Sequence, residues 1–314
     1  PRICARPASD PPRRPQRSMA TAAAAAAATA GARASAATTV VILRHGERMD
    51  YADPTWMARQ RALGVEGRPF DPPLTPLGMR QAALAGEAIA AHLEELGRPQ
   101  PTRVFTSPFI RCVETATNAA PGVKAGAEPS LSELLSEDWL RSWALPDSDG
   151  TWGGPWRRRH EAVDPGALHP LVNDFAAAVR DAPAIGRPDA LDEAYVPAVA
   201  PSAVVEGLSW PEGESYDKAM ERIAGFIRSL PERYPGETVL LVSHGGVLAH
   251  AYEHLVGRQY AWDIGYTSCF VYAPPAEAGG AWTVLVDNSH DHVRVAAREE
   301  QQRQRLAAEG DGGP

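Results

Sequence analysis

The chain has 314 residues and a formal net charge of −8, an acidic balance that excludes a typical nucleic-acid-binding protein. Its three cysteines are too few for a disulfide framework or a cysteine-based zinc site, which favours a reducing, cytoplasmic location. No run of about 18 apolar residues has the side chains of a membrane span, and the length suits one large α/β domain with an insertion.

Residues 1–37 are rich in Arg, Ala, Pro and Ser and contain one acidic residue, Asp10. This composition is typical of a disordered, low-complexity extension. It is equally typical of a plastid or mitochondrial transit peptide, so an organellar location is the alternative to a cytoplasmic one. We therefore expect the folded domain to begin near residue 38.

A buried β-strand is predicted at 38–43, where the run is apolar and β-branched. Arg44, His45 and Gly46 follow directly, at the carboxyl end of the strand, where open α/β sheets bind ligands. A neutral imidazole is a nucleophile, and a guanidinium group can hold a phosphate through forked hydrogen bonds. This string therefore indicates phosphoryl chemistry with a histidine nucleophile.

Helices are predicted over 76–96 and 108–119, with Thr75 and Ser107 as their expected N-caps. Arg111 would then lie in the first turn of the second helix, where its side chain and free backbone N–H groups can meet an anion. A solvated surface arginine is the commoner fate of a single Arg and stays open as the alternative.

The periodic pattern weakens over 139–211, a stretch that is rich in Trp, Gly and Pro. We expect an inserted cap of loops and helices over the catalytic edge, because loops on a rigid scaffold commonly set specificity. The tryptophans either line a pocket for a phenyl or apolar leaving group or anchor the packing of the insertion, and both interpretations stay open.

A second buried strand is predicted at 238–243, and His244 and Gly245 follow it. A lone histidine after a strand is more often structural than catalytic. Parallel strands, however, bring their carboxyl ends to one edge of a sheet. Two strand-end His-Gly pairs in one chain therefore favour a shared site that contains both His45 and His244.

The residues His250, Glu253 and His254 spell H-x-x-E-H, the inverted signature of a group of zinc proteases. Two histidines at this spacing can share a helix face, but a third protein ligand is still required. The residues that follow are mainly predicted strands and a polar tail, which do not supply the usual ligand-bearing helix. We therefore predict no metal site and no cofactor.

Alternating strands and helices predict an α/β fold, a three-layer α/β/α sandwich with a mostly parallel central sheet and an inserted cap region. The domain is expected over 38–297, with the cap at about 139–211 and a polar C-terminal tail, a fraying helix, at 298–314. The remaining predicted strands are 102–106, 268–273 and 282–287, and the remaining predicted helices are 214–230 and 246–256.

Four motifs occur in an order that resembles the histidine phosphatase superfamily, with its phosphoglycerate mutase-like fold. They are RHG at 44–46, LTxxG at 74–78, SPxxRCxxTA at 107–116 and SHGG at 243–246. The resemblance covers about 38–292. Within the superfamily, the motif wording looks closest to the Sts/TULA-type protein phosphatases, and ecdysteroid-phosphate phosphatases are similar.

The resemblance implies a metal-independent phosphomonoesterase that forms a phosphohistidine. His45 would attack phosphorus, and His244 would donate hydrogen bonds to the transferring phosphoryl group. Arg44 and Arg111 would clamp the phosphoryl oxygens, with Arg48 as a third guanidinium group. This assignment agrees with the needs of phosphoryl transfer, which depends mainly on positioning and charge stabilisation.

The leaving oxygen also needs a proton, so a general acid is expected near the phosphoryl site. The resemblance implies Glu133, in the stretch EPSLSEL at 128–134. The close alternatives are Glu128 and Glu137, and the weaker ones are Glu212 and Glu214.

The expected substrate is a phosphorylated small molecule or a phosphoprotein, with phosphotyrosine and small aryl or alkyl phosphates as candidates. A mutase or sugar-bisphosphatase on the same fold is one alternative, and it would need phosphosugar contacts in the cap. A non-catalytic phosphate-binding scaffold is the other, although no core residue is missing. The sequence leaves the oligomeric state open, with a homodimer as one option.

Overall fold

The computed structural model describes residues 37–63, 71–133, 188–198, 215–260, 263–277 and 279–310. They belong to one compact unit of the chain, Ala37–Pro314. Most of the predicted N-terminal extension, most of the predicted cap and the candidate acids Glu137, Glu212 and Glu214 lie outside the described residues. What the sequence indicates about them stays a prediction.

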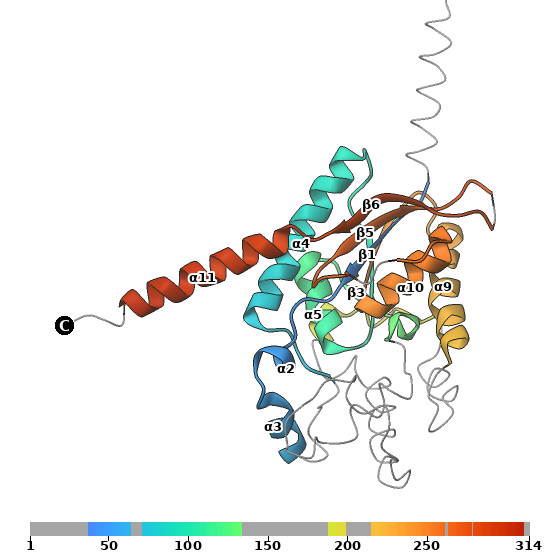
Figure 1. Ribbon diagram of the computed structural model, residues 1–314. Coiled ribbons are helices and arrows are strands. Elements are labelled where there is room, and N and C mark those ends of the chain that lie inside the picture. Colours follow the sequence, from blue (N-terminus) through green and yellow to red (C-terminus); the bar gives the residue numbers. More distant parts are fainter. Residues whose placement is uncertain are drawn as a thin grey trace, which may run out of the picture. The chain divides into compact units, whose positions relative to one another are not determined.

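A six-stranded sheet has the order β3-β2-β4-β1-β5-β6 (Figure 1). The strands are β1 (Thr39–Arg44), β2 (Arg103–Thr106), β3 (Ala125–Ala127), β4 (Thr238–Ser243), β5 (Cys269–Ala273) and β6 (Thr283–Ser289). The first four pair in parallel, whereas β5 pairs antiparallel with both β1 and β6. The predicted, mostly parallel central sheet is therefore confirmed.

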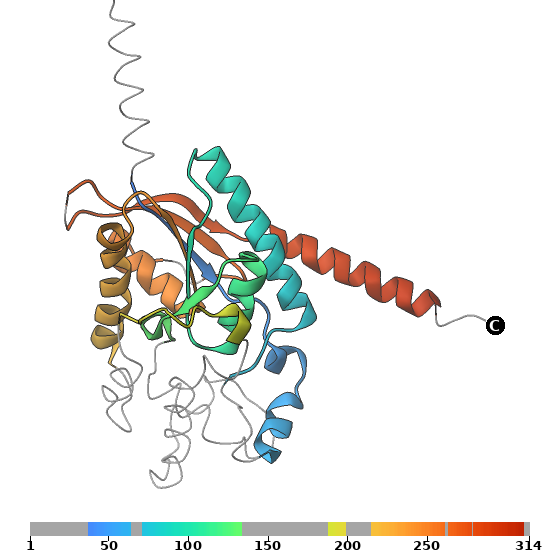
Figure 2. The ribbon, with the colours of Figure 1, turned by 180° about the vertical axis from the view of Figure 1, so that it is seen from behind.

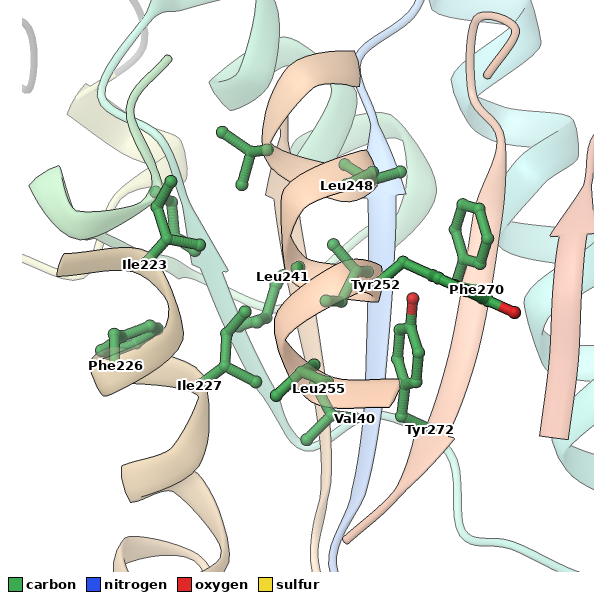
Figure 3. Close-up of a cluster of buried hydrophobic side chains, with 14 of the residues drawn as sticks. Val40, Ile223, Phe226, Ile227, Leu241, Leu248, Tyr252, Leu255, Phe270 and Tyr272 are labelled. Atoms are coloured by element: carbon green, nitrogen blue, oxygen red, sulfur yellow. The ribbon is translucent and has the colours of Figure 1, made fainter. Parts of the chain in front are cut away.

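One face of the sheet is covered by α9 (Tyr216–Arg233) and α10 (Gly245–Val256). Successive strand residues point to opposite faces, so Val40 and Ile42 of β1 face these two helices. Figure 3 shows this cluster, in which Ile223, Phe226 and Ile227 of α9 and Leu248, Tyr252 and Leu255 of α10 are labelled.

The opposite face is covered by α4 (Pro76–Glu95) and α5 (Ile110–Ala119), as the two ribbon views show (Figures 1 and 2). Val41 and Leu43 of β1 pack there with residues of both helices in a second buried cluster. Two helical layers on either side of one sheet confirm the predicted α/β/α sandwich.

The two predicted helix starts have different outcomes. Thr75 caps α4 as predicted, since its Oγ1 accepts a hydrogen bond of 2.9 Å from the backbone N–H of Gly78. The prediction for α5 is wrong, because the helix begins at Ile110 with Phe109 in the N-cap position. Ser107 lies before the helix and uses its hydroxyl group elsewhere.

Several short elements were not predicted: α2 (Met49–Ala52), α3 (Trp56–Ala62), η2 (Pro129–Leu131), η3 (Pro188–Ala190) and the strand β3. The sequence of β3 is Ala-Gly-Ala, which has low intrinsic strand propensity. It becomes a strand because β2 pairs with it in parallel, from Val104 opposite Ala125 to Thr106 opposite Ala127. Tertiary pairing thus overrides local preference at this edge.

The last helix, α11 (His292–Gly310), crosses the predicted boundary at residue 298. Its first half packs on α4, where Glu299 forms two hydrogen bonds with Arg80, at 2.7 and 3.0 Å. Residues 301–307 are exposed. None of the described helices, α11 included, is long and apolar enough to cross a membrane.

Candidate active site

The two strand-end histidines meet because their strands are neighbours. β1 and β4 pair with Arg44 opposite Ser243, so His45 and His244 leave the sheet side by side. Their ring centroids are 5.5 Å apart, the rings meet edge to face, and both side chains are buried. The structure therefore brings together the pair that the sequence selects.

His45 is held in one tautomer by its own loop. Its Nδ1 lies 2.8 Å from the carbonyl oxygen of Gly46, which can only accept, so Nδ1 carries the proton and Nε2 the electron pair. Burial, followed by the positive charges of Arg111 and Arg44, holds the pKa of His45 well below its usual value of 6.5. The side chain is thus a neutral imidazole at physiological pH.

The loop after β1 packs closely on α4 and α5. The backbone N–H of Gly46 donates to Oγ1 of Thr115 at 3.0 Å. A Cβ at Gly46 would lie 2.5 Å from the carbonyl oxygen of Gly78, and a Cβ at Gly78 would lie 2.3 Å from that of Glu47. Both positions therefore require glycine, and the LTxxG and SPxxRCxxTA motifs support the loop that carries His45.

Arg111 is completely buried and lies between two carboxylates and a histidine. Its Nη2 is 2.9 Å from Oε2 of Glu133 and 3.2 Å from Nδ1 of His244, and its Nη1 is 3.8 Å from Oδ1 of Asp71. Within the described part of the chain, Nε and Nη1 of Arg111 and Nε of Arg44 have no hydrogen-bond partner. Since buried donors normally have partners, these groups fit an anion such as a phosphoryl group.

Two further arginines flank His45. Arg44 donates through Nη1 to the carbonyl oxygen of Ile264, and its guanidinium carbon lies 4.7 Å from the ring centre of Tyr266. Arg48 is buried, and its Nε and Nη2 donate to the two carboxylate oxygens of Asp50 at 3.0 and 2.6 Å. The forked face of Arg48 is therefore engaged by a carboxylate of the protein, and its clearest contribution to the site is positive charge.

Of the two candidate acids in the described residues, Glu133 lies in the site and Glu128 does not. Oε2 of Glu133 is 3.7 Å from Nδ1 of His244 as well as beside Arg111, and 22% of the side chain is exposed. Glu128 is fully buried. Its carboxylate accepts hydrogen bonds of 2.6 to 3.0 Å from Ser130 N, Ser130 Oγ, Tyr195 Oη and Ala198 N. The role of Glu128 is thus to fasten the segment around Tyr195 to the turn after β3.

Three residues that were not predicted as site residues also belong to the site. Ser107 places its Oγ 2.8 Å from Nε2 of His244, Asp71 lies beside Arg111, and the Tyr266 ring centre is 6.0 Å from that of His45. Ser107 follows the carboxyl end of β2, as His45 and His244 follow β1 and β4. The same sequence pattern could therefore have predicted Ser107 as a site residue. Asp71 and Tyr266 lie in segments without a periodic pattern and carry no such signal.

The H-x-x-E-H residues lie on α10, and the structure gives them separate surroundings. Nδ1 of His250 is 3.6 Å from Oε2 of Glu253, His250 is buried and His254 is exposed. Burial lowers the pKa of His250, although Glu253 opposes the shift. In the portion of the chain that the structure describes, no group of three His, Cys, Asp or Glu residues could hold a metal ion.

The family model of the histidine phosphatase superfamily (branch 1) matches residues 40–182 and 191–285 of the chain. Ecdysteroid-phosphate phosphatase from Bombyx mori is 33% identical over 132 residues, which is 34% of this chain and 18% of that protein. Ubiquitin-associated and SH3 domain-containing protein A from Homo sapiens is 24% identical over 242 residues, which is 70% of this chain and 31% of that protein. These matches confirm the resemblance that the motifs indicate.

The chain spans between about a fifth and a third of the length of these curated relatives, 18% and 31% respectively. Among solved structures, the ecdysone phosphate phosphatase of Bombyx mori in complex with tungstate is 22% identical, with a TM-score of 0.48. That similarity covers 80% of this chain and 93% of the other.

Proposed function

Because the chain belongs to the histidine phosphatase superfamily, we propose that it is a phosphoric monoester hydrolase that works through a phosphohistidine on His45. The observation that carries the proposal is the state of this side chain. It is buried and neutral, with its proton on Nδ1 and its electron pair on Nε2, among three arginines. A nucleophile in that state needs no base to remove a proton before it attacks phosphorus.

Arg44 and Arg111 are proposed to bind the phosphoryl oxygens. Nε of Arg44 and both Nε and Nη1 of Arg111, which have no hydrogen-bond partner within the described residues, supply charge-assisted donors that are already in place. Little reorganisation is therefore required when the transition state forms. Arg48 adds positive charge from its place on Asp50. Phosphoryl transfer depends mainly on such positioning and charge stabilisation.

His244 is proposed to assist as a hydrogen-bond donor to the same group. Burial and then Arg111 and His45 lower the pKa of His244 well below its usual value. A doubly negative phosphoryl group would oppose the effect of the arginines and favour the protonated ring. Its Nδ1–H, which faces the Arg111 side, would then donate to a phosphoryl oxygen.

The reaction is proposed to proceed in two steps. In the first, Nε2 of His45 forms a bond to phosphorus, the bond from phosphorus to the leaving oxygen breaks, and the carboxylic acid of Glu133 gives that oxygen its proton. In the second, the Glu133 carboxylate takes a proton from water as the water oxygen attacks phosphorus. The P–N bond breaks, inorganic phosphate leaves and His45 returns to its neutral form.

The substrate is proposed to be a phosphomonoester with an aryl or apolar leaving group, on a small molecule or a phosphoprotein. Two aromatic side chains of the described residues support this choice. Tyr266 stacks on Arg44 beside the His45 ring, and Tyr51 lies 4.8 Å from the Arg48 guanidinium carbon with 64% of its area exposed. The name of the Bombyx mori relative, ecdysteroid-phosphate phosphatase, fits an apolar leaving group.

The test is hydrolysis of an aryl phosphate in excess EDTA by the wild type and the His45→Ala variant. We expect activity that resists EDTA in the wild type and is lost in the variant. His254→Ala is the matched control, because it removes an exposed histidine of the H-x-x-E-H string and is expected to keep activity. Activity that survives His45→Ala would overturn the proposed nucleophile, and loss of wild-type activity in EDTA would favour a metal mechanism.

A further inference from the structure

The turn that carries Glu133 is held by an arginine that lies outside the phosphoryl site. From its contacts we infer that Arg222 of α9 is a positioning residue, which sets Glu133 against the leaving oxygen. This inference rests on the proposed role of Glu133 as the general acid. It adds a residue that touches neither the phosphoryl group nor the reacting atoms.

Arg222 binds four main-chain carbonyl groups of one short turn. Its Nη1 lies 2.8 Å from the carbonyl oxygen of Ser130 and 3.1 Å from that of Ser132. The same atom is 3.3 Å from the carbonyl oxygen of Pro129, and Nη2 is 3.4 Å from that of Glu133. These partners are 89 to 93 residues away in sequence, so the clamp is a tertiary contact between α9 and the 129–133 turn.

The remaining carbonyl group of this turn, that of Leu131, is bound from the other side. It accepts a hydrogen bond of 2.6 Å from Oγ of Ser243, the residue directly before His244. The turn is therefore fastened both to α9 and to the end of β4. Each carbonyl group from 129 to 133 has a donor, and the main chain at Glu133 is fixed relative to His244.

The chemistry of the site explains why an arginine suits this position. The turn contains the short helix η2 (Pro129–Leu131), and carbonyl groups at the end of a helical turn need donors from elsewhere. A guanidinium group presents five N–H donors in a planar fork, so one side chain can serve several carbonyl groups. The Glu133 side chain extends from this fixed main chain to Arg111 and His244.

A displaced acid has a kinetic signature that general destabilisation lacks. A nitrophenolate leaves phosphorus with little help from an acid, whereas an alkoxide needs a proton as the P–O bond breaks. The pair of 4-nitrophenyl phosphate and 4-nitrobenzyl phosphate presents almost the same group to the pocket, with one methylene of difference. The ratio of kcat/KM on the two substrates therefore reports the acid, because kcat/KM covers only the steps up to departure of the leaving group. By contrast, kcat also includes hydrolysis of the phosphohistidine, in which Glu133 is proposed to act as the base.

The experiment compares this ratio in the wild type, Glu133→Gln, Arg222→Gln and the double variant, with thermal unfolding of each protein as the check on folding. For Arg222→Gln we expect kcat/KM on the benzyl ester to fall about 10- to 100-fold, and kcat/KM on the phenyl ester to stay within about threefold. The double variant is expected to have the same ratio as Glu133→Gln. Arg222→Lys keeps the positive charge and one point of contact, so its ratio is expected to lie between those of the wild type and Arg222→Gln.

Arg228→Gln is the matched control, because Arg228 lies on the same helix and also donates to a main-chain carbonyl group, that of His254, at 2.8 Å. Its ratio is expected to equal that of the wild type. The inference is overturned if Arg222→Gln and Arg222→Lys lower kcat/KM equally on both esters, or if neither ratio changes while that of Glu133→Gln does. An unchanged ratio in Glu133→Gln would overturn the acid and with it this inference, whereas the role of His45 is tested separately by His45→Ala.

Discussion

The Oγ atom of Ser107 lies 2.8 Å from Nε2 of His244. Together with the contact on Nδ1, it determines which ring nitrogen carries the proton. Arg111 is 3.2 Å from Nδ1 and can only donate, so Nδ1 holds the electron pair and Nε2 carries the proton. Ser107 then accepts from Nε2. The edge of the ring that faces Arg111 and Glu133 is thus the edge that can gain a proton when an anion binds.

Replacement of Ser107 by alanine removes the acceptor for the Nε2 proton. We expect Ser107→Ala to lower kcat about 10-fold and the free energy of unfolding by about 1–3 kcal/mol, because the buried Nε2–H of His244 loses its acceptor and the ring is less restricted in orientation. Steady-state kinetics with an aryl phosphate measures this effect. Ser229→Ala on α9, which removes a hydroxyl bonded to the carbonyl group of Phe226, is the comparison, and equal kcat values for both variants would contradict the role of Ser107.

The contact between the loop after β1 and the start of α4 leaves no room for a side chain. In Gly78→Ala, the new Cβ would meet the carbonyl oxygen of Glu47 at 2.3 Å, so we expect a loss of about 1–3 kcal/mol in the free energy of unfolding. Gly225→Ala, an exposed helical position with nothing within 4 Å of the new Cβ, should instead gain about 0.5–1 kcal/mol. Urea unfolding measures both changes, and similar stability of the two variants would refute the close approach.

Arg111 combines complete burial with a forked set of donors that a lysine cannot reproduce. We expect Arg111→Lys to lower kcat/KM about 100-fold or more and to weaken inhibition by inorganic phosphate, since both depend on the same N–H groups. Arg80→Lys changes a partly exposed arginine that pairs with Glu299 and should leave both quantities unchanged. Normal phosphate inhibition in Arg111→Lys would show that the clamp lies elsewhere.

Buried neutral histidines make stability dependent on pH. Burial is the first cause that lowers the pKa of His45 and His244, so the folded chain binds fewer protons than the unfolded chain below pH 6.5. Their contribution to stability is complete above that pH and is lost as the pH falls below it. Below this pH, the free energy of unfolding should fall as the pH falls. We expect His45→Asn to reduce that slope by up to about 1.4 kcal/mol per pH unit. Urea unfolding between pH 5 and 8 measures the slope, and identical slopes would argue against a neutral His45.

The sequence was sufficient to predict that the two histidines and Arg111 lie at one edge of the sheet, because each position depends on a local pattern. His45 and His244 follow apolar strands whose parallel pairing could be inferred, and Arg111 lies in the first turn of a helix, as expected. Ser107 shows the limit of such patterns. A serine before Pro-x-x-Arg is typical of an N-cap, but its hydroxyl binds His244, and only the tertiary arrangement of β2 and β4 decides between these two partners.

The choice among the glutamates depended even more on tertiary structure. Glu128 and Glu133 are five residues apart and chemically the same, yet the first is enclosed by four donors and the second faces Arg111. The donors on Glu128 come in part from Tyr195 and Ala198, which are about 70 residues away in sequence. Arg222 could not be predicted either, because its partners are main-chain carbonyl groups that leave no pattern in the sequence.

The most direct test of the central claim is to trap the intermediate by rapid quenching during turnover of a radiolabelled aryl phosphate. We predict that label appears on the protein before phosphate is released, that it is stable to alkali and labile to acid, and that peptide mapping places it on His45. Steady turnover without any labelled protein, or label on a residue other than His45, would contradict the account.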